Sequence, residues 1–187
     1  MPAFDHFGFL APYYDRMAKP APPMDLLERL NLNNQSHVLD VGGGTGRVAQ
    51  TLIPYAGSVT VVDLSYKMLQ QAKLKPGLRI AMSVSEHLPY PADAFDAVLM
   101  VDAFHHVIDQ QLTLRELFRV LKPGGTIVVK EPDIKTFAVK VVAVAEKLLG
   151  MRSHIISGEK IAGMFVSCCK EAQVYRKEYT VWVMVKK

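Results

Sequence analysis

The sequence has little cysteine: its 187 residues include only Cys168 and Cys169, which are adjacent. Adjacent thiols are poorly placed to bridge distant segments, which argues against a disulfide framework and favours a reducing compartment. We expect both to be buried thiols in a helix. The first residues also lack the basic region and apolar stretch of a signal peptide, so a cytoplasmic location is expected.

Long apolar runs and a strong excess of one charge are missing too. No uninterrupted apolar run approaches the ~20 residues of a membrane span. The 22 basic and 18 acidic residues leave a net charge of +4. The basic excess lies after Leu121, where lysines are spaced singly through apolar segments, so a solvated face is favoured over an anionic partner. We therefore expect no nucleic-acid partner, no transmembrane segment and at most weak contact with a membrane surface.

What the sequence does contain is an alternation of apolar strands and helices within about one domain's length. A proline-rich stretch closes an amino-terminal arm, residues 1–23, and a single domain is expected over residues 24–187. Uninterrupted apolar strands predict a parallel sheet covered on both faces, hence a doubly wound α/β fold whose ligand lies beyond the carboxyl ends of the strands. We expect strands at 37–41, 58–63, 79–83, 97–101 and 126–130 and helices at 24–30, 47–53, 66–73, 111–121 and 137–151.

Three glycines at alternating positions, Gly42, Gly44 and Gly46, follow the first strand and lead into a helix. Such a turn lets a ligand approach the backbone closely, and two classes of cofactor use it. Residues 44–49 fit the dinucleotide fingerprint G-x-G-x-x-A, and Asp63 lies 19 residues after Gly44, near the spacing of the acid that binds a ribose. The loop alone therefore leaves an NAD-dependent oxidoreductase open.

Asp40 shifts the balance between the two cofactors. It precedes the first glycine by two residues, so its carboxylate would repel the pyrophosphate of a dinucleotide and favour a cationic ligand. S-adenosylmethionine carries a sulfonium group, an ammonium group and a ribose. Asp40 would attract the ammonium group, and Asp63 would accept hydrogen bonds from both ribose hydroxyls.

Four ordered motifs resemble those of class I S-adenosylmethionine-dependent methyltransferases, in the small-molecule group that includes the ubiquinone and menaquinone methyltransferases. The motifs lie at residues 38–46 (VLDVGGGTG), 61–65 (VVDLS), 85–96 (SEHLPY with AFD) and 117–125 (LFRVLKPGG). Residues 9–15 (FLAPYYD) also resemble the opening of the quinone subgroup. The resemblance implies a Rossmann-like, mostly parallel seven-stranded sheet in three α/β/α layers, closed by an antiparallel pair within residues 173–187. It also implies S-adenosylmethionine as the cofactor.

One position departs from the family pattern. Many relatives have an acid that binds the adenine amino group, where this sequence has Val84. Adenine recognition would then rest on backbone groups of Val84 and Ser85 and on apolar contact. The predicted cofactor-binding residues are Asp40, Gly42, Gly43, Gly44, Gly46, Asp63, Leu64, Val84, Ser85, Glu86 and Val101.

The best candidates for a catalytic base are His105 and His106, which follow the fourth strand. Imidazole titrates near physiological pH, and the carboxyl end of the sheet is where a substrate would lie. The alternative interpretation is that one histidine caps the next helix and the other packs beside the cofactor. No metal is expected, because adjacent histidines point apart and no third ligand is spaced to meet them.

Four further residues are candidates for binding the methyl acceptor. Glu131 and Asp133 follow the fifth strand, although with a proline between them they would equally suit a solvated turn. Tyr13 and Tyr14 lie on the arm that the resemblance places over the pocket, where their alternative role is aromatic docking of the arm. The helix at 137–151 would cover the sheet or wall an apolar acceptor pocket.

The sequence therefore predicts an enzyme, an S-adenosylmethionine-dependent methyltransferase acting on a small molecule, with a lipophilic quinone-like compound as one candidate acceptor. In-line methyl transfer depends mainly on alignment of the nucleophile and exclusion of water. We expect a monomer or a homodimer. Two alternatives remain open: an NAD-dependent oxidoreductase, and a non-catalytic protein that binds S-adenosylmethionine within a complex.

Overall fold

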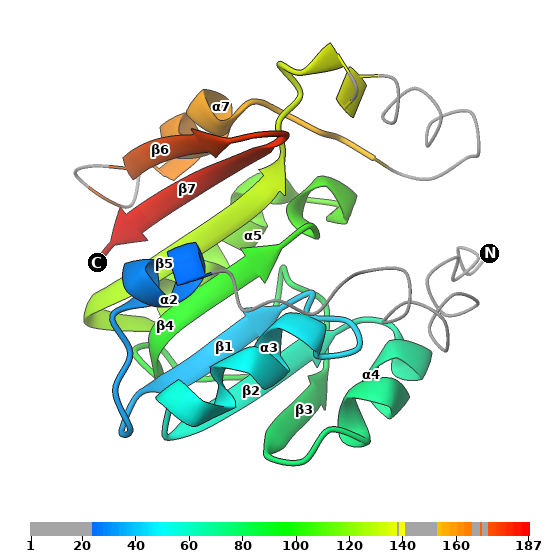
Figure 1. Ribbon diagram of the computed structural model, residues 1–187, viewed down its shortest axis with the longest axis vertical. Coiled ribbons are helices and arrows are strands. Elements are labelled where there is room, and N and C mark those ends of the chain that lie inside the picture. The colour runs from blue at the N-terminus through cyan, green and yellow to red at the C-terminus, as the bar shows by residue number, and fades with distance from the viewer. Residues whose placement is uncertain (1–23, 138, 141–152, 166–168, 170–171) are drawn as a thin grey trace.

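A computed structural model describes residues 24–137, 139–140, 153–165, 169 and 172–187, which form a seven-stranded sheet covered by helices (Figure 1). The order of the strands across the sheet is β3-β2-β1-β4-β5-β7-β6. The predicted fold class is confirmed. The predicted arm at 1–23, with Tyr13 and Tyr14, lies outside the described residues. The strands are β1 His37–Val41, β2 Ser58–Asp63, β3 Leu78–Met82, β4 Phe95–Val101, β5 Leu121–Pro132, β6 Ala172–Lys177 and β7 Thr180–Lys186.

Five strands run parallel, and β7 runs antiparallel between β5 and β6. The arrowheads of β1, β2, β4 and β5 therefore point to one edge of the sheet, while β7 points the opposite way (Figure 1). The central strands are buried on both faces, as their uninterrupted apolar sequences require. This geometry gathers the segments that follow β1, β2, β4 and β5 at a common edge.

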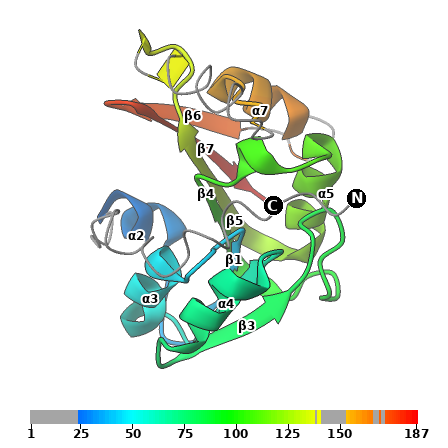
Figure 2. The same cartoon turned by 90° about the vertical axis from the view of Figure 1, so that its right-hand side faces the viewer.

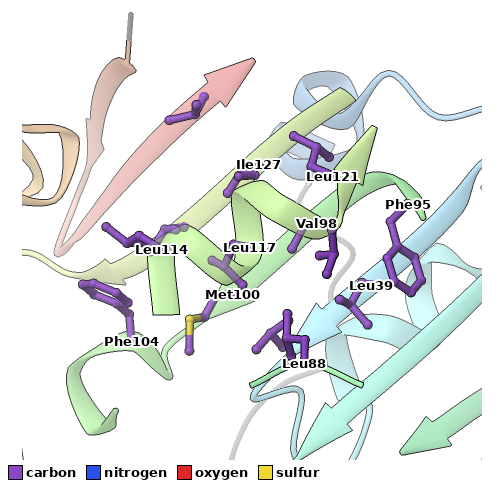
Figure 3. Packing of buried hydrophobic residues seen from close by; sticks show 14 of the residues in the cluster. Leu39, Leu88, Phe95, Val98, Met100, Phe104, Leu114, Leu117, Leu121 and Ile127 are labelled. Carbon is purple, nitrogen blue, oxygen red and sulfur yellow. The ribbon is translucent and has the colours of Figure 1, made fainter. Parts of the chain in front are cut away.

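Helices cover both faces of the sheet (Figure 2), and a hydrophobic core lies between the sheet and the helices on each face. One packs the sheet against α5 and α7, and the other packs it against α2, α3 and α4. In the first core Leu114 and Leu117 are fully buried against the strands (Figure 3), each stabilising the fold by about 1.5–3 kcal/mol. The helices are α2 Met24–Leu30, α3 Arg47–Leu52, α4 Tyr66–Lys73, α5 Gln110–Val120 and α7 Gly158–Phe165, with short 3-10 turns η1 Ile53–Tyr55 and η2 Phe104–His106.

Side chains cap the starts of two helices. The Ser65 side chain accepts a hydrogen bond from the Met68 N–H at the start of α4, and Asp109 does the same for the Leu112 N–H at the start of α5. Strand β5 is longer than the predicted 126–130, because Leu121 already pairs with Phe95 across an irregularity in the ladder. At its other end β5 continues to Pro132 by pairing with β7, so Glu131, which pairs with Val181, lies within the strand.

Two expectations about the carboxy-terminal part are affected by the structure. Cys169 is only half-buried and follows the end of α7 at Phe165, so its predicted place in a helix is wrong; Cys168 lies outside the described residues. Of the predicted helix at 137–151, residues 137, 139 and 140 are helical, and 141–152 lie outside the described part. Within the described residues, no helix has the length and apolar character needed to span a membrane.

Candidate active site

The glycine loop, residues 42–46, begins where β1 ends and is held against β2. The N–H groups of Gly42 and Gly43 both donate to the Val62 carbonyl, at 2.7 and 3.2 Å. Gly42, Gly44 and Gly46 have φ values of 68, 56 and 73°, in the left-handed region that side chains disfavour. The alternating glycines are therefore needed for the turn itself.

Among these glycines, Gly44 is in different surroundings. A Cβ on Gly42 would lie 2.6 Å from the Ala103 Cβ, and one on Gly46 would lie 2.5 Å from a Leu78 methyl. A Cβ on Gly44 would meet only ordinary contacts of 3.9 Å or more. Packing within the protein thus accounts for Gly42 and Gly46, whereas among the described residues a Cβ on Gly44 would make only ordinary contacts, so packing does not account for that glycine.

Asp63 ends β2 and connects the glycine loop to the start of α4. One carboxylate oxygen accepts from the Gly44 N–H and the other from the Ser65 N–H, both at 2.8 Å. The side chain is half-buried. Since each carboxylate oxygen has a second lone pair, Asp63 can still accept from a pair of ribose hydroxyls. The observed geometry therefore fits its predicted role.

Asp40 lies beneath the glycine loop, with 1% of its surface exposed. A Cβ on Gly43 would be 2.7 Å from its Oδ2. Burial, and then the Asp63 carboxylate, raise the pKa of Asp40 to about 7; the Arg47 charge and the Ala49 N–H offset part of the rise. Neither oxygen of Asp40 has a partner within hydrogen-bond geometry in the described structure. A buried carboxylate in this state is suited to a cationic ligand group.

Exposed apolar side chains lie beside these acids. Leu64, directly after β2, is 68% exposed, and Met82, the last residue of β3, is 63% exposed. Val84 and Ser85 follow β3 and are half-buried. Apolar groups beside acids of this kind suit an adenine ring; Leu64 was predicted as a cofactor-binding residue without a specified role. Met82 was not among the predicted cofactor-binding residues, although its position at the end of a strand could have indicated that it lies at the ligand edge.

Glu86 was predicted to bind the cofactor, but its carboxylate makes hydrogen bonds elsewhere. Its Oε1 accepts from the Ile108 and Asp109 N–H groups, at 2.9 and 3.1 Å, and its Oε2 accepts from the Ser85 hydroxyl. The Ser85 hydroxyl is also 3.1 Å from that of Thr113. Glu86 therefore connects the loop after β3 to the start of α5. The structure does not place its carboxylate with Asp40 and Asp63.

The turn after β4 brings His105 together with Glu131. Glu131 is 2% exposed, and its Oε1 accepts from the N–H groups of Ala103 and Phe104, at 3.0 and 2.8 Å. Its Oε2 contacts Nδ1 of His105, which is 5% exposed. The His106 ring packs against that of His105 at a tilt of 47°, with 3.9 Å between centroids, so the expectation that these adjacent histidines point apart is wrong. The solvated-turn interpretation of Glu131 is therefore wrong.

The remaining candidates at this edge have other contacts. Asp133 is 3% exposed; it pairs with Arg176 of β6 at 3.2 Å and also accepts from the Lys135 N–H. It is not a solvated turn residue either. Val101 ends β4 and is half-buried. Asp102, which was not predicted, has a φ of 53° and pairs with Lys130 at 3.3 Å. Unusual backbone at the end of a strand is typical of functional sites.

A shallow polar hollow of about 370 Å³ lies at the opposite edge, where β1 begins. It is lined by residues including His37, Asp96 and Lys122. The Asp96 carboxylate accepts from the backbone N–H of His37 and pairs with the Lys122 ammonium group. These groups satisfy one another. The ligand edge is instead the one that carries Gly44, Asp63 and Leu64.

Strand order separates the two cofactor classes that the glycine loop left open. The dinucleotide fold has the order 3-2-1-4-5-6, whereas here an antiparallel β7 lies between β5 and β6. Together with the acids at the glycine loop, this sheet defines a Rossmann-like domain of the class I methyltransferase type, whose cofactor is S-adenosylmethionine. An NAD-dependent oxidoreductase is not favoured.

Comparison with known proteins agrees with this class. Residues 39–129 match the family model described as a methyltransferase domain. The chain is 35% identical over 146 residues to 2-methyl-6-phytyl-1,4-hydroquinone methyltransferase of Spinacia oleracea, covering 72% of this chain and 42% of that protein. It is 33% identical over 115 residues to the ubiquinone/menaquinone biosynthesis C-methyltransferase UbiE of Geotalea daltonii, covering 56% and 49%. The chain thus spans about half the length of these relatives.

Solved structures share the fold across nearly the whole chain. A SAM-dependent methyltransferase of Thermotoga maritima superposes with a TM-score of 0.79 at 22% identity, covering 97% of both chains. A Haloferax volcanii protein, solved in complex with a methyltransferase activator, superposes with a TM-score of 0.80 at 19% identity, again covering 97% of both. The solved structures therefore show the shared fold, and the family model and the relatives show that the chain resembles S-adenosylmethionine-dependent methyltransferases of the ubiquinone/menaquinone group.

Proposed function

We propose that the protein transfers a methyl group from S-adenosylmethionine to a small lipophilic acceptor of the hydroquinone type. The single observation that supports cofactor binding most strongly is the pair of acids at the glycine loop. Asp40 is buried with neither oxygen in a hydrogen bond to any described residue, and Asp63 accepts from the N–H of Gly44, where a Cβ would meet only ordinary contacts. A ligand with one cationic end and a ribose would satisfy both acids.

In this proposal, different residues at the edge bind different parts of the cofactor. Asp40 binds the ammonium end, and Asp63 accepts from the ribose hydroxyls. Leu64 and the backbone of Val84 and Ser85 contact the adenine. The bound cofactor supplies an activated methyl carbon, and the chain's own residues align the acceptor and exclude water. His105 or His106 removes a proton from the acceptor where the reacting atom carries one.

The hydroquinone class of acceptor rests on the relatives and on two exposed apolar residues. The Spinacia protein is named for a hydroquinone substrate, and the Geotalea protein for quinone biosynthesis. In this chain Ile108, in the loop before α5, is 78% exposed, and Phe137, after β5, is 82% exposed. Both follow strands that end at the ligand edge, where apolar side chains suit a lipophilic ring or tail.

Cofactor binding is tested by calorimetry with S-adenosylhomocysteine on the wild type and on Asp63→Ala. The substitution removes both the ribose acceptors and the tie to Gly44, so we expect affinity to fall well over tenfold. Asp96→Ala, at the opposite edge, is the matched control and should leave affinity within threefold. If the wild type binds neither S-adenosylhomocysteine nor S-adenosylmethionine, the proposal is wrong.

The acceptor is tested separately with methyl-labelled S-adenosylmethionine and a panel of small hydroquinones, phenols, amines and thiols. We expect label to appear on hydroquinones in preference to amines and thiols. Transfer only to amines or thiols would overturn the hydroquinone assignment while leaving the cofactor assignment intact. Cofactor binding with no transfer to any member, together with a stable protein partner on pull-down, would favour a non-catalytic binding protein.

A further inference from the structure

Glu131 contacts three consecutive residues of the turn after β4. Its Oε1 accepts from two backbone N–H groups, those of Ala103 and Phe104, and its Oε2 meets Nδ1 of His105. The carboxylate is 2% exposed and lies one residue before the end of β5. One side chain on the neighbouring strand therefore fixes both the backbone of the turn and the ring that the turn carries.

The turn is also fixed from two other sides. Phe104 is 1% exposed and lies near Leu114 in the core under α5 (Figure 3). Ala103 lies against Gly42, because a Cβ added there would come within 2.6 Å of the Ala103 Cβ. The turn that carries His105 therefore adjoins the proposed cofactor-binding loop. A base on this turn would lie near the place where the acceptor receives the methyl group.

We propose that Glu131 is a positioning residue that holds His105 in the tautomer with its proton on Nδ1, so that Nε2 accepts a proton from the methyl acceptor. Glu131 Oε1 already accepts from two backbone N–H groups, which favours the ionised carboxylate, and an ionised carboxylate has acceptors only. The shared proton therefore lies on Nδ1. This is the role of the buried acid in nucleophile–histidine–acid systems, where the acid orients the imidazole and stabilises the imidazolium that forms.

The inference rests on the proposed function and narrows its acceptor to one that loses a proton, such as a phenolic or hydroquinone ring. The acceptor's proton passes to Nε2 of His105, and the freed electron pair forms the bond to the methyl carbon. The carbon–sulfur bond breaks with its electron pair going to sulfur, which neutralises the sulfonium. His105 then releases the proton to solvent. Glu131 keeps its charge throughout and does not contact the acceptor.

The test is Glu131→Gln, read first by nitrogen-15 NMR of the histidine rings in the complex with S-adenosylhomocysteine. The His105 signals are assigned by their loss in His105→Gln. In the wild type we expect the neutral ring to carry its proton on Nδ1. In Glu131→Gln the amide oxygen keeps the two backbone N–H groups, so the amide NH₂ faces Nδ1 and the proton moves to Nε2.

Kinetics with the hydroquinone found in the acceptor panel give a second readout. We expect kcat of Glu131→Gln to fall roughly a hundred- to ten-thousand-fold, with KM and the affinity for S-adenosylhomocysteine within threefold of the wild type. Glu116→Gln is the matched control, because Glu116 also accepts a backbone N–H, from Leu88, and pairs with a cation, Arg119. It should leave the His105 tautomer and kcat unchanged.

An Nε2–H tautomer in the wild type, or the same tautomer in both proteins, overturns the inference, and this result needs no known acceptor. Equal kcat in the wild type and Glu131→Gln overturns it as well. Failure of the proposed function has a different signature, since S-adenosylhomocysteine would then not bind while the tautomer difference persisted in the free protein.

Discussion

The glycine loop and the turn after β4 lie at the same edge of the sheet, yet their polar groups are in opposite states. Asp40, beneath the loop, has no partner within hydrogen-bond geometry among the described residues, and packing does not account for the glycine at position 44. Glu131, beneath the turn, has two backbone donors and an imidazole. The first region needs a ligand to satisfy it, whereas the second is organised before any ligand arrives. This division suits an enzyme that binds a cofactor and then positions a nucleophile.

The largest expected effect comes from Gly42→Ala, because Gly42 is where the two regions touch. The new methyl group would lie 2.6 Å from the Ala103 Cβ, which has no torsion of its own with which to move away, and φ is 68°. We expect the free energy of unfolding to fall by roughly 2–4 kcal/mol, from left-handed strain and overpacking together. Urea unfolding measures it.

Gly44→Ala is the control for that experiment, since it has similar backbone strain without the clash. It should lower the free energy of unfolding by about 1–2 kcal/mol. It should also lower the affinity for S-adenosylhomocysteine more than tenfold, because its methyl group would keep the cofactor from approaching the backbone of the loop. A stability loss in Gly44→Ala as large as in Gly42→Ala would show that packing does not distinguish the two glycines.

Asp40→Asn should change cofactor affinity and stability in opposite directions, with weaker binding and a larger free energy of unfolding at high pH. The folded pKa of about 7 lies above the ordinary value of 3.8, so the folded protein resists ionisation that the unfolded chain accepts. The contribution of Asp40 to stability is full below about pH 4 and is lost as pH rises to about 7, by at most about 4 kcal/mol. Asparagine stays neutral but buries an amide, so at pH 8 we expect a net gain of roughly 1–3 kcal/mol.

At pH 4 the same substitution should give no gain in unfolding free energy, and at every pH it should weaken S-adenosylmethionine binding more than tenfold. Because the ammonium group favours the ionised carboxylate, binding to the wild type at pH 7 should release protons. Calorimetry in two buffers of different ionisation enthalpy measures the release, which should vanish in Asp40→Asn. A variant less stable than the wild type at both pH values would contradict the assignment of a strained buried charge.

The parts of this fold that the sequence predicted well are those set by local pattern. The apolar runs at His37–Val41 and Ser58–Asp63 form β1 and β2 with the predicted bounds. A strand buried on both faces needs apolar residues at nearly every position, so its sequence is easy to recognise. Serine directly before a helix is typical of a cap, and the Ser65 hydroxyl makes that bond at the start of α4. The glycines and the two acids were found from spacing along one segment.

What the sequence could not show depends on contacts between distant segments. Glu131 and His105 are 26 residues apart and meet only because β4 and β5 pair in parallel. Whether a carboxylate ends in water, on an arginine or on an imidazole is decided by that register. The same holds for the contact of Gly42 with Ala103: the motif indicates Gly42, but nothing in the sequence pairs it with Ala103.

Glu86 shows the same limit and gives the smallest predicted effect. Its family-based assignment put it in the cofactor site, but its carboxylate instead accepts from the N–H groups of Ile108 and Asp109 at the start of α5. Glu86→Gln keeps one acceptor oxygen, so we expect the free energy of unfolding to fall by about 1 kcal/mol. The affinity for S-adenosylhomocysteine should stay within threefold. A loss beyond tenfold would return Glu86 to the cofactor site and require the loop after β3 to rearrange when the cofactor binds.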